Sequence, residues 1–222
     1  MMTNLFSSFD PSTSIYLSFN WLSTITCFML IPLTYWFLPN RMIMMKMLVM
    51  NVLNKEFKMI MNYKMKGSLL MMMSMFSFIM INNLMGLLPY IFTSSSHLTF
   101  SLSLALPLWL TLMIFGWLNN TNHMFAHLIP TGTPSLLMPF MVLIETISNI
   151  IRPGSLAVRL TANMIAGHLL MTLLGNSSLN CKSYMMMLIT LIQILLMMFE
   201  LAVSLIQAYV FSILSTLYSS EI

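Results

Sequence analysis

The sequence predicts an all-α integral membrane protein with about five spanning helices and one interfacial amphipathic helix. Of its 222 residues, 59% are hydrophobic and only 6% are charged, whereas soluble domains carry about 25% charged residues. Several apolar runs reach the roughly 20 residues that a helix needs to cross the hydrocarbon core. The last two runs are much longer and predict two steeply tilted helices packed as a hairpin. We therefore expect a single transmembrane domain over residues 1–222.

The first predicted span covers residues 16–38, and a basic amphipathic segment follows at 40–66. Trp21, Tyr35 and Trp36 lie near the ends of the span, as in an aromatic belt. The segment sets lysines and arginine among Met, Leu, Val and Phe, which is typical of a helix lying in the interface. A basic loop without membrane contact is the alternative. By the positive-inside rule the segment lies on the matrix or cytoplasmic side, with the N-terminus opposite.

The second and third predicted spans, 67–88 and 97–118, are joined by a short serine-rich turn and form a hairpin. The second span carries Asn82 and Asn83, whose amides favour hydrogen bonds between helices in an apolar environment. Pro89 disfavours a helical conformation at the residue before it, so the helix should end at that point. These features predict two adjacent antiparallel helices.

The polar connection 119–134 contains His123 and His127, four residues apart, a spacing that can hold a metal ion on one helical face. No third ligand is near them in the sequence, so we expect interfacial histidines and neither a metal nor a cofactor. Cys27 and Cys181 form no CxxC pair and no disulfide framework. The chain therefore offers no evident redox or metal chemistry.

The last two predicted spans, 135–174 and 183–218, would be about 60 Å and about 54 Å long as continuous helices. A hydrocarbon core is only about 30 Å thick, so such helices must tilt strongly or break. Pro139 and Pro153 offer positions for bending in the first of them. The connection between the two helices, residues 175–182, is expected on the side opposite the basic segment.

Polar residues recur at intervals of seven on both long helices, and this interval keeps them on one helical face. They are Glu145, Arg152 and Arg159 on the first helix, with Asn163 one turn further, and Gln193, Glu200 and Gln207 on the second. Each helix therefore carries a polar stripe through the membrane. The stripes could form a buried structural ion-pair network, but ionisable groups inside membranes more often mark a pathway.

Arg159 is the central residue of the stripe on the first long helix. Burying arginine near the middle of a membrane costs about 2.5 to 3.5 kcal/mol on insertion scales, and its guanidinium stays protonated. Glu145 and Glu200 are titratable carboxylates, and histidine titrates near neutral pH. Glu145 lies toward the basic-segment side and His168 toward the other. We infer two separate half-paths for protons with a permanent cation between them.

Three groups of residues are specific enough to identify a family, unlike the apolar background of the chain. They are the run 152–163 followed by Gly167 and His168, the run 83–89, and Glu200 followed by Gln207. In these motifs, and over essentially its whole length, the chain resembles subunit a of the mitochondrial rotary ATP synthases. A composition rich in methionine and asparagine, with 28 Met, is similar to that of proteins encoded in organelle genomes.

The resemblance implies a role for each polar residue of the stripes. Arg159 would be the essential, catalytic arginine that faces the carboxylates of the rotating c-ring. His168 and Glu200 would line the half-channel from the intermembrane space, and Glu145 the half-channel to the matrix. Asn163 and Gln207 would be polar neighbours of Arg159. Arg152 would be a structural or channel-lining residue.

The resemblance also implies function, partners and location. The chain would be the proton-translocating stator subunit of the membrane sector, with no nucleotide site or catalytic nucleophile of its own. Its partners would be c-ring proteolipids, the peripheral stalk, other small membrane subunits and the lipid bilayer. No nucleic-acid partner is expected, because most of the net charge of +4 sits in one segment. It would lie in the mitochondrial inner membrane with its N-terminus toward the intermembrane space and the segment 40–66 toward the matrix.

Three other classes of membrane protein share parts of this pattern. An antiporter-like, proton-pumping subunit of a respiratory complex should carry lysines within its spans, whereas every lysine here lies in a connection. A haem- or copper-binding oxidase subunit would need pairs of histidines within its helices, and only His168 lies deep in a long segment. A structural membrane scaffold would tolerate replacement of Arg159 without effect.

Overall fold

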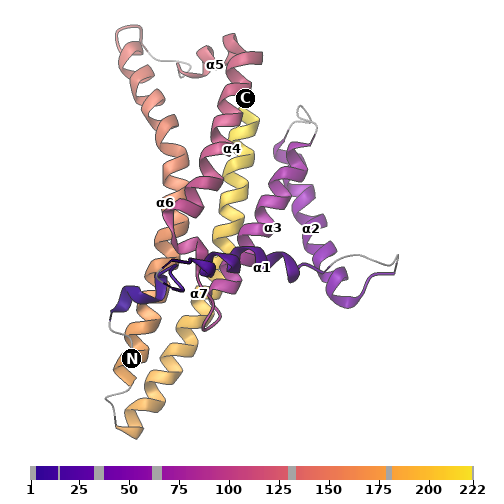
Figure 1. Cartoon of the computed structure of the whole chain (residues 1–222). Coiled ribbons are helices and arrows are strands. Elements are labelled where there is room, and N and C mark those ends of the chain that lie inside the picture. The colour runs from indigo at the N-terminus through magenta and orange to yellow at the C-terminus, as the bar shows by residue number, and fades with distance from the viewer. Residues whose placement is uncertain are drawn as a thin grey trace.

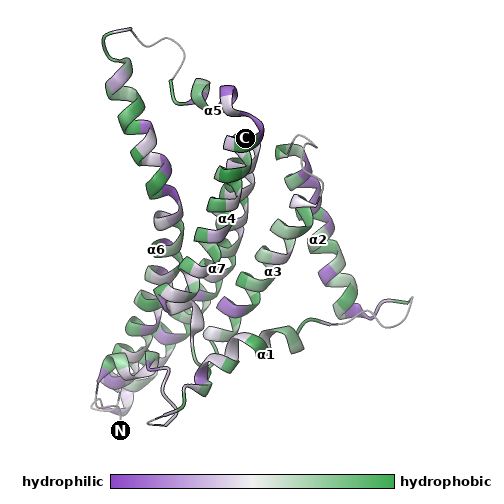
Figure 2. Ribbon diagram, turned by 45° about the horizontal axis from the view of Figure 1, so that its top comes forward, coloured by the Kyte–Doolittle hydropathy of each residue, from purple (hydrophilic) through white to green (hydrophobic). Residues whose placement is uncertain are grey.

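The computed structural model describes residues 4–14, 16–32, 38–61, 67–129, 134–178 and 182–221. Within these ranges all regular structure is helical, which confirms the predicted fold class (Figure 1). Four of the described helices are long and apolar enough to cross a membrane, against about five expected. They are α3 (Ser68–Gly86), α4 (Leu98–Asn119), α6 (Met138–Ser178) and α7 (Ser183–Glu221), and hydrophobic residues run along each of them (Figure 2).

The helices α3 and α4 lie within two residues of the predicted second and third spans. Gly67 precedes α3 with a φ of 95°, a left-handed conformation that glycine adopts without strain. The turn between the helices contains the 3-10 helix η3 (Ser94–Ser96), whose three serines are buried. Ser96 satisfies its hydroxyl locally by donating to the carbonyl of Thr93 at 2.7 Å. The turn joins α3 and α4 as predicted, but α3 packs mainly against α7 and α4 mainly against α6, so the predicted pairing of these two helices is not the main packing of either.

The helices α6 and α7 contain 41 and 39 residues and form the predicted hairpin, each about 60 Å long. Both helices run without interruption. Pro139 lies in the first turn of α6, where a backbone N–H would have no partner within the helix, so proline is tolerated there. Pro153 lies inside the helix and does not end it. Small and branched side chains, Ala157 and Leu160 of α6 and Ala208 of α7, are fully buried in one cluster with apolar side chains of α3 and α4. This core fixes the centre of the hairpin against the rest of the bundle.

The predicted first span, 16–38, is described only in part, because residues 33–37 lie outside the described ranges. Its described helices are η2 (Phe19–Leu22) and α1 (Ser23–Met29), and seven residues are too few to cross a bilayer. Figure 1 shows α1 lying across α3 rather than along it. Ser23 donates to the carbonyl of Phe92 at 3.2 Å, so a tertiary contact that hydropathy does not encode holds this segment in place.

The basic segment forms the helix α2 (Arg41–Ile60), while residues 62–66 lie outside the described ranges. Its apolar side chains Leu53 and Phe57 are buried against the bundle. Glu56, the lone acid of the segment, accepts a hydrogen bond of 2.9 Å from the hydroxyl of Tyr209 on α7. The helix is therefore attached to the bundle, and its position in the membrane interface stays a prediction.

The first half of α7 is uncovered. No residue from 183 to 203 is buried, although this part of the helix is the most hydrophobic in the described chain. Such a surface is stable only against lipid or other apolar protein. The α7 half-helix is thus available to the membrane and to neighbouring subunits.

Candidate functional site

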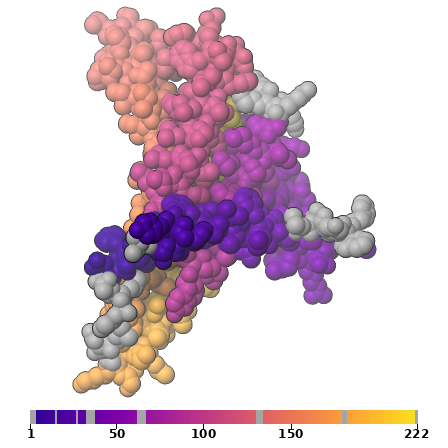
Figure 3. Space-filling model, in the orientation of Figure 1, coloured from indigo at the N-terminus to yellow at the C-terminus, as the bar shows by residue number. Residues whose placement is uncertain are grey.

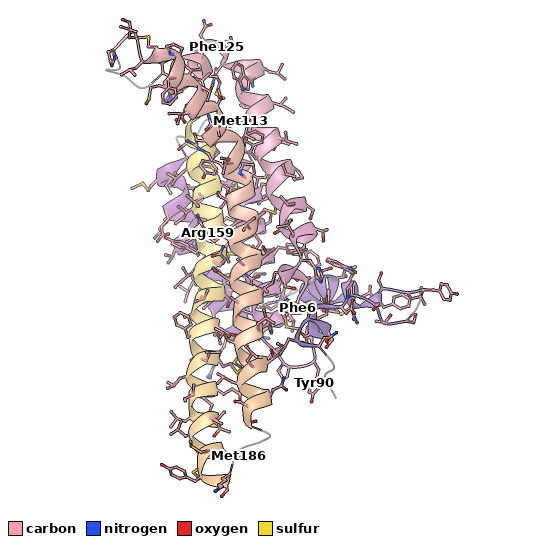
Figure 4. All side chains as sticks on the ribbon, turned by 90° about the vertical axis from the view of Figure 1, so that its left-hand side faces the viewer. Phe6, Tyr90, Met113, Phe125, Arg159 and Met186 are labelled. Atoms are coloured by element: carbon pink, nitrogen blue, oxygen red, sulfur yellow. The ribbon has the colours of Figure 1, made fainter. Side chains whose placement is uncertain are left out.

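A polar cavity of about 860 Å³ lies beside the half of the hairpin nearer the α6–α7 turn. Its walls are His168 and Thr172 of α6, Gln193 and Glu200 of α7, the turn 87–93 and part of the N-terminal segment 4–14. His168 and Glu200, predicted to lie on one half-path, therefore share a cavity. We call it the lower cavity, after its place in Figure 4.

Two polar atoms at the lower cavity are buried without a hydrogen-bond partner among the described residues, Nε2 of His168 and Oε1 of Glu200. Buried polar atoms in proteins are nearly always hydrogen-bonded, so an unpartnered pair of this kind indicates water or an exchanging proton. The His168 ring is also within hydrogen-bonding reach of the Gly86 backbone. Two titratable groups thus lie together at one cavity, each with a buried polar atom that no described residue binds.

Gly167 makes room for the Glu200 carboxyl group. A Cβ at position 167 would lie 2.9 Å from Cδ and 3.0 Å from Oε1 of Glu200. Carbon atoms that are not bonded approach no closer than about 3.5 Å without repulsion. The carboxyl group therefore rests directly on the backbone of α6, one residue before His168.

A second cavity, of about 480 Å³, lies at the opposite half of α6 and is called the upper cavity. Its polar lining comes from Glu145, Asn149 and Arg152 of α6, together with His127 and Tyr218. Arg152 Nη2 lies 3.4 Å from Glu145 Oε1, and its guanidinium carbon lies 5.0 Å from the centre of the Tyr218 ring. The predicted matrix-side carboxylate therefore lies in a cavity of its own, tethered by Arg152.

Arg159 lies between the two cavities. Figure 4 shows it at mid-height on the α6–α7 pair, below Met113 of the upper cavity and above Tyr90 of the lower one. Its side chain is exposed, and no described residue forms a hydrogen bond or an ion pair with it. The buried ion-pair network considered as an alternative would require Arg159 and Glu200 to be paired. Neither is paired with any described residue.

The two long helices are joined next to Arg159. Asn163, one turn beyond it, donates a hydrogen bond of 3.1 Å from Nδ2 to Oε1 of the buried Gln207. One turn earlier on α7, the carbonyl of Ser204 accepts a hydrogen bond of 3.5 Å from Nδ2 of Asn83 on α3. Amide side chains therefore fix the relative positions of α3, α6 and α7 at the level of the arginine.

Several residues of the two cavities were not singled out by sequence. Tyr218 and Trp109 belong to other helices, and no spacing along α6 could have placed them near Arg152. His123 and His127 were singled out for their spacing, and their rings lie 4.4 Å apart. Within the described ranges no three His, Cys, Asp or Glu side chains gather in a way that could hold a metal ion.

Comparison with known proteins gives a consistent result. The family described as ATP synthase A chain matches residues 16–220. ATP synthase subunit a of Aedes aegypti is 61% identical, that of Anopheles gambiae 60% and that of Drosophila melanogaster 58%, each over the full length of both chains. No comparison supports an antiporter-like subunit of a respiratory complex. The chain therefore belongs to the ATP synthase A chain family, the proton-translocating subunit a of the ATP synthase membrane sector.

Proposed function

We propose that the chain conducts protons through two offset half-channels, the lower cavity and the upper cavity, that meet the c-ring on either side of Arg159. The observation that carries this proposal is their arrangement: two separate cavities, each with its own carboxylate, flank an exposed arginine that has no partner among the described residues. A continuous channel would let protons cross the membrane without driving rotation. Two half-channels require a carrier between them, and a rotating ring of carboxyl groups is such a carrier.

On the lower side, protons reach His168 and Glu200 from the intermembrane space. Their unpartnered buried atoms can hold a proton and pass it to a ring carboxylate at the α6–α7 surface. Protonation removes the charge of that carboxyl group, and a neutral group enters lipid at a far lower desolvation cost. The loaded ring subunit can then rotate away through the bilayer.

On the upper side, Glu145 accepts the proton that a ring carboxyl group releases after nearly a full rotation. Arg159 favours the ionised form of that carboxyl group as it arrives, because an opposite charge stabilises the carboxylate. Arg152, held over the Tyr218 ring, keeps Glu145 oriented in its cavity. The proton then leaves to the matrix.

The proposed partners follow from the uncovered surface and from the family. As a subunit of ATP synthase, the chain is part of a multi-subunit complex in the mitochondrial inner membrane. The exposed first half of α7 and the face of Arg159 are the surfaces that we assign to the c-ring. The peripheral stalk, other small subunits and lipid cover the remainder. In this orientation the lower cavity and the N-terminus face the intermembrane space, and α2 faces the matrix.

The sidedness of the two cavities can be measured directly. In a variant whose Cys27 and Cys181 are replaced by serine, Thr172→Cys places a thiol in the lower cavity and Asn149→Cys places one in the upper. We expect a membrane-impermeant methanethiosulfonate to block ATP-driven proton pumping only from the intermembrane side in the first variant, and only from the matrix side in the second. Pumping is measured with a pH-sensitive dye in vesicles of each orientation.

A matched control is Met59→Cys, an exposed position on α2 outside both cavities and outside the surface assigned to the c-ring. It should react with the reagent without loss of pumping. If either cavity variant is blocked from both sides, or both are blocked from the same side, the two half-channels are not separate and the proposal fails.

Replacing Gly167 by alanine should displace the Glu200 carboxyl group. The added methyl group would lie 2.9 Å from Cδ of Glu200, so the side chain must rotate away from α6. A displacement of about 1 Å in a reacting group can reduce a rate by up to about a hundredfold, and we expect a loss of about tenfold in pumping. Gly175→Ala is the control, because no atom lies within 4 Å of a Cβ at that position. Equal rates for both variants would contradict the assigned role of Gly167.

A further inference from the structure

The N-terminal segment 4–14 forms the outer wall of the lower cavity. Its 3-10 helix η1 (Leu5–Phe9) packs against α6, and Ser7, Ser8, Phe9 and Asp10 line the cavity opposite Glu200. Figure 3 shows the N-terminal part of the chain crossing the face of the helix bundle. The position of this wall therefore affects the surroundings of His168.

His97, the residue before α4, binds this wall. Its Nε2 atom lies 2.9 Å from the carbonyl oxygen of Phe9. A carbonyl oxygen can only accept a hydrogen bond, so Nε2 of His97 must carry the hydrogen. The imidazole ring stacks on Phe92, with ring centres 5.3 Å apart, and contacts Trp21 at a tilt, with ring centres 5.2 Å apart. His97 is thus a donor whose direction is fixed by two aromatic rings.

The neighbouring peptide of the wall has a second tether. Nδ2 of Asn20 donates to the carbonyl oxygen of Asp10 at 3.2 Å. Two successive carbonyl groups, those of Phe9 and Asp10, are therefore held by side chains from outside the segment. Such paired contacts restrict the backbone far more than one contact does, because they also fix its rotation.

Phe9 carries the effect of these contacts to His168. Its ring meets the His168 ring edge to face, with centres 6.2 Å apart and planes at 89°. Nε2 of His168 has no hydrogen-bond partner among the described residues, so its direction depends on what holds the rest of the ring, namely the Gly86 backbone and the packed neighbours. Phe9 is an aromatic neighbour that supplies this packing from the outer wall.

We propose that His97 is a positioning residue for His168: it holds the carbonyl of Phe9, and the Phe9 ring then sets the orientation of the His168 imidazole in the lower cavity. This inference rests on the proposed function of His168 as a proton carrier. His97 itself does not line the cavity and carries no proton in this scheme. Its contribution is geometric, and it requires a donor at the position of Nε2.

The test uses the assembled enzyme in inner-membrane vesicles, with assembly verified by native electrophoresis. His97→Ala removes the donor, Phe9→Ala removes the ring but keeps the carbonyl, and His97→Gln keeps an N–H donor at a similar distance. We expect the first two variants to lose about tenfold in the rate of ATP-driven pumping, and His97→Gln to retain most of it. His123→Ala, an exposed histidine outside both cavities, should pump normally.

A second measurement separates positioning from a general effect on the protein. In the Thr172→Cys variant without native cysteines, the reaction rate of the thiol reports access to the lower cavity. We expect His97→Ala and Phe9→Ala to raise that rate about fivefold or more, since the first no longer holds the outer wall and the second removes a ring from it, and His97→Gln to leave it near the original value.

Three results would overturn the inference: normal pumping by assembled His97→Ala, unchanged thiol reactivity in a variant with reduced pumping, or equal impairment of His97→Gln and His97→Ala. The failure of the proposed function is recognised separately. If Arg159→Ala pumps normally, the half-channel mechanism is wrong. If Arg159→Ala is inactive while His97→Ala is normal, only the role of His97 is wrong.

Discussion

Arg159→Ala is expected to abolish ATP-driven proton pumping and to open a passive proton leak. The guanidinium lies between the two cavities, and no described protein group neutralises it. Without it, a protonated ring carboxyl group can pass directly from one cavity to the other, and protons then cross without a full rotation of the ring. Each proton moving down about 100 mV dissipates about 2.3 kcal/mol, so even a slow leak would collapse the coupling.

Both effects of this substitution can be recorded in one preparation. Pumping is followed after ATP addition, and leak is followed as the decay of an imposed pH gradient with the enzyme idle. Arg159→Lys keeps a positive charge but lacks the planar fork that binds carboxylates in two places, so we expect low leak with poor pumping. Arg41→Ala, on α2 and outside both cavities, is the control. Pumping by Arg159→Ala at the normal rate would refute the mechanism and leave a scaffold role.

Glu200→Gln should also abolish pumping, but without any leak. Glutamine has nearly the same shape as glutamate and cannot take up a proton, so the lower half-channel loses a carrier while Arg159 still separates the two sides. The rate should fall to background in both ATP synthesis and ATP-driven pumping, because one half-channel serves both directions. The decay of an imposed pH gradient should match that of the unmodified enzyme.

The matched control for this variant is Glu56→Gln. Glu56 accepts its hydrogen bond from Tyr209 outside both cavities, and a glutamine carbonyl can accept the same bond. It should pump normally. A leak in Glu200→Gln would mean that Glu200 helps to close the path, and substantial remaining pumping would mean that His168 alone suffices.

The sequence predicts those features that depend on one helix at a time. Hydropathy and length give α3, α4, α6 and α7 to within a few residues, because each must satisfy its own backbone inside the membrane. The interval of seven residues places Glu145 and Arg152 on one face, and the structure brings their side chains to 3.4 Å. The same periodicity identifies the stripe of α7 that contains Glu200 and Gln207.

Contacts between distant segments are what the sequence does not reveal. The edge of Phe9 on His168, the Tyr218 ring beneath Arg152 and the pairing of Asn163 with Gln207 join residues from different elements. The predicted first span shows the same limit: its described helix, α1, lies across α3 because Ser23 and Trp21 contact the turn before α4. Hydropathy gives the length of an apolar run but not its direction.

The bond between Asn163 and Gln207 has a mechanical consequence. Helices that pack with ridges in grooves have alternative registers, and a slip by one turn would move α7 by about 5.4 Å along α6. Such a slip would carry Glu200 away from Gly167 and change its height relative to Arg159. The 3.1 Å hydrogen bond between the two amides, together with the buried core, therefore selects one register and with it the vertical offset between the proton-loading carboxylate and the barrier charge. That offset determines how close Glu200 comes to a carboxyl group of the c-ring when it transfers a proton.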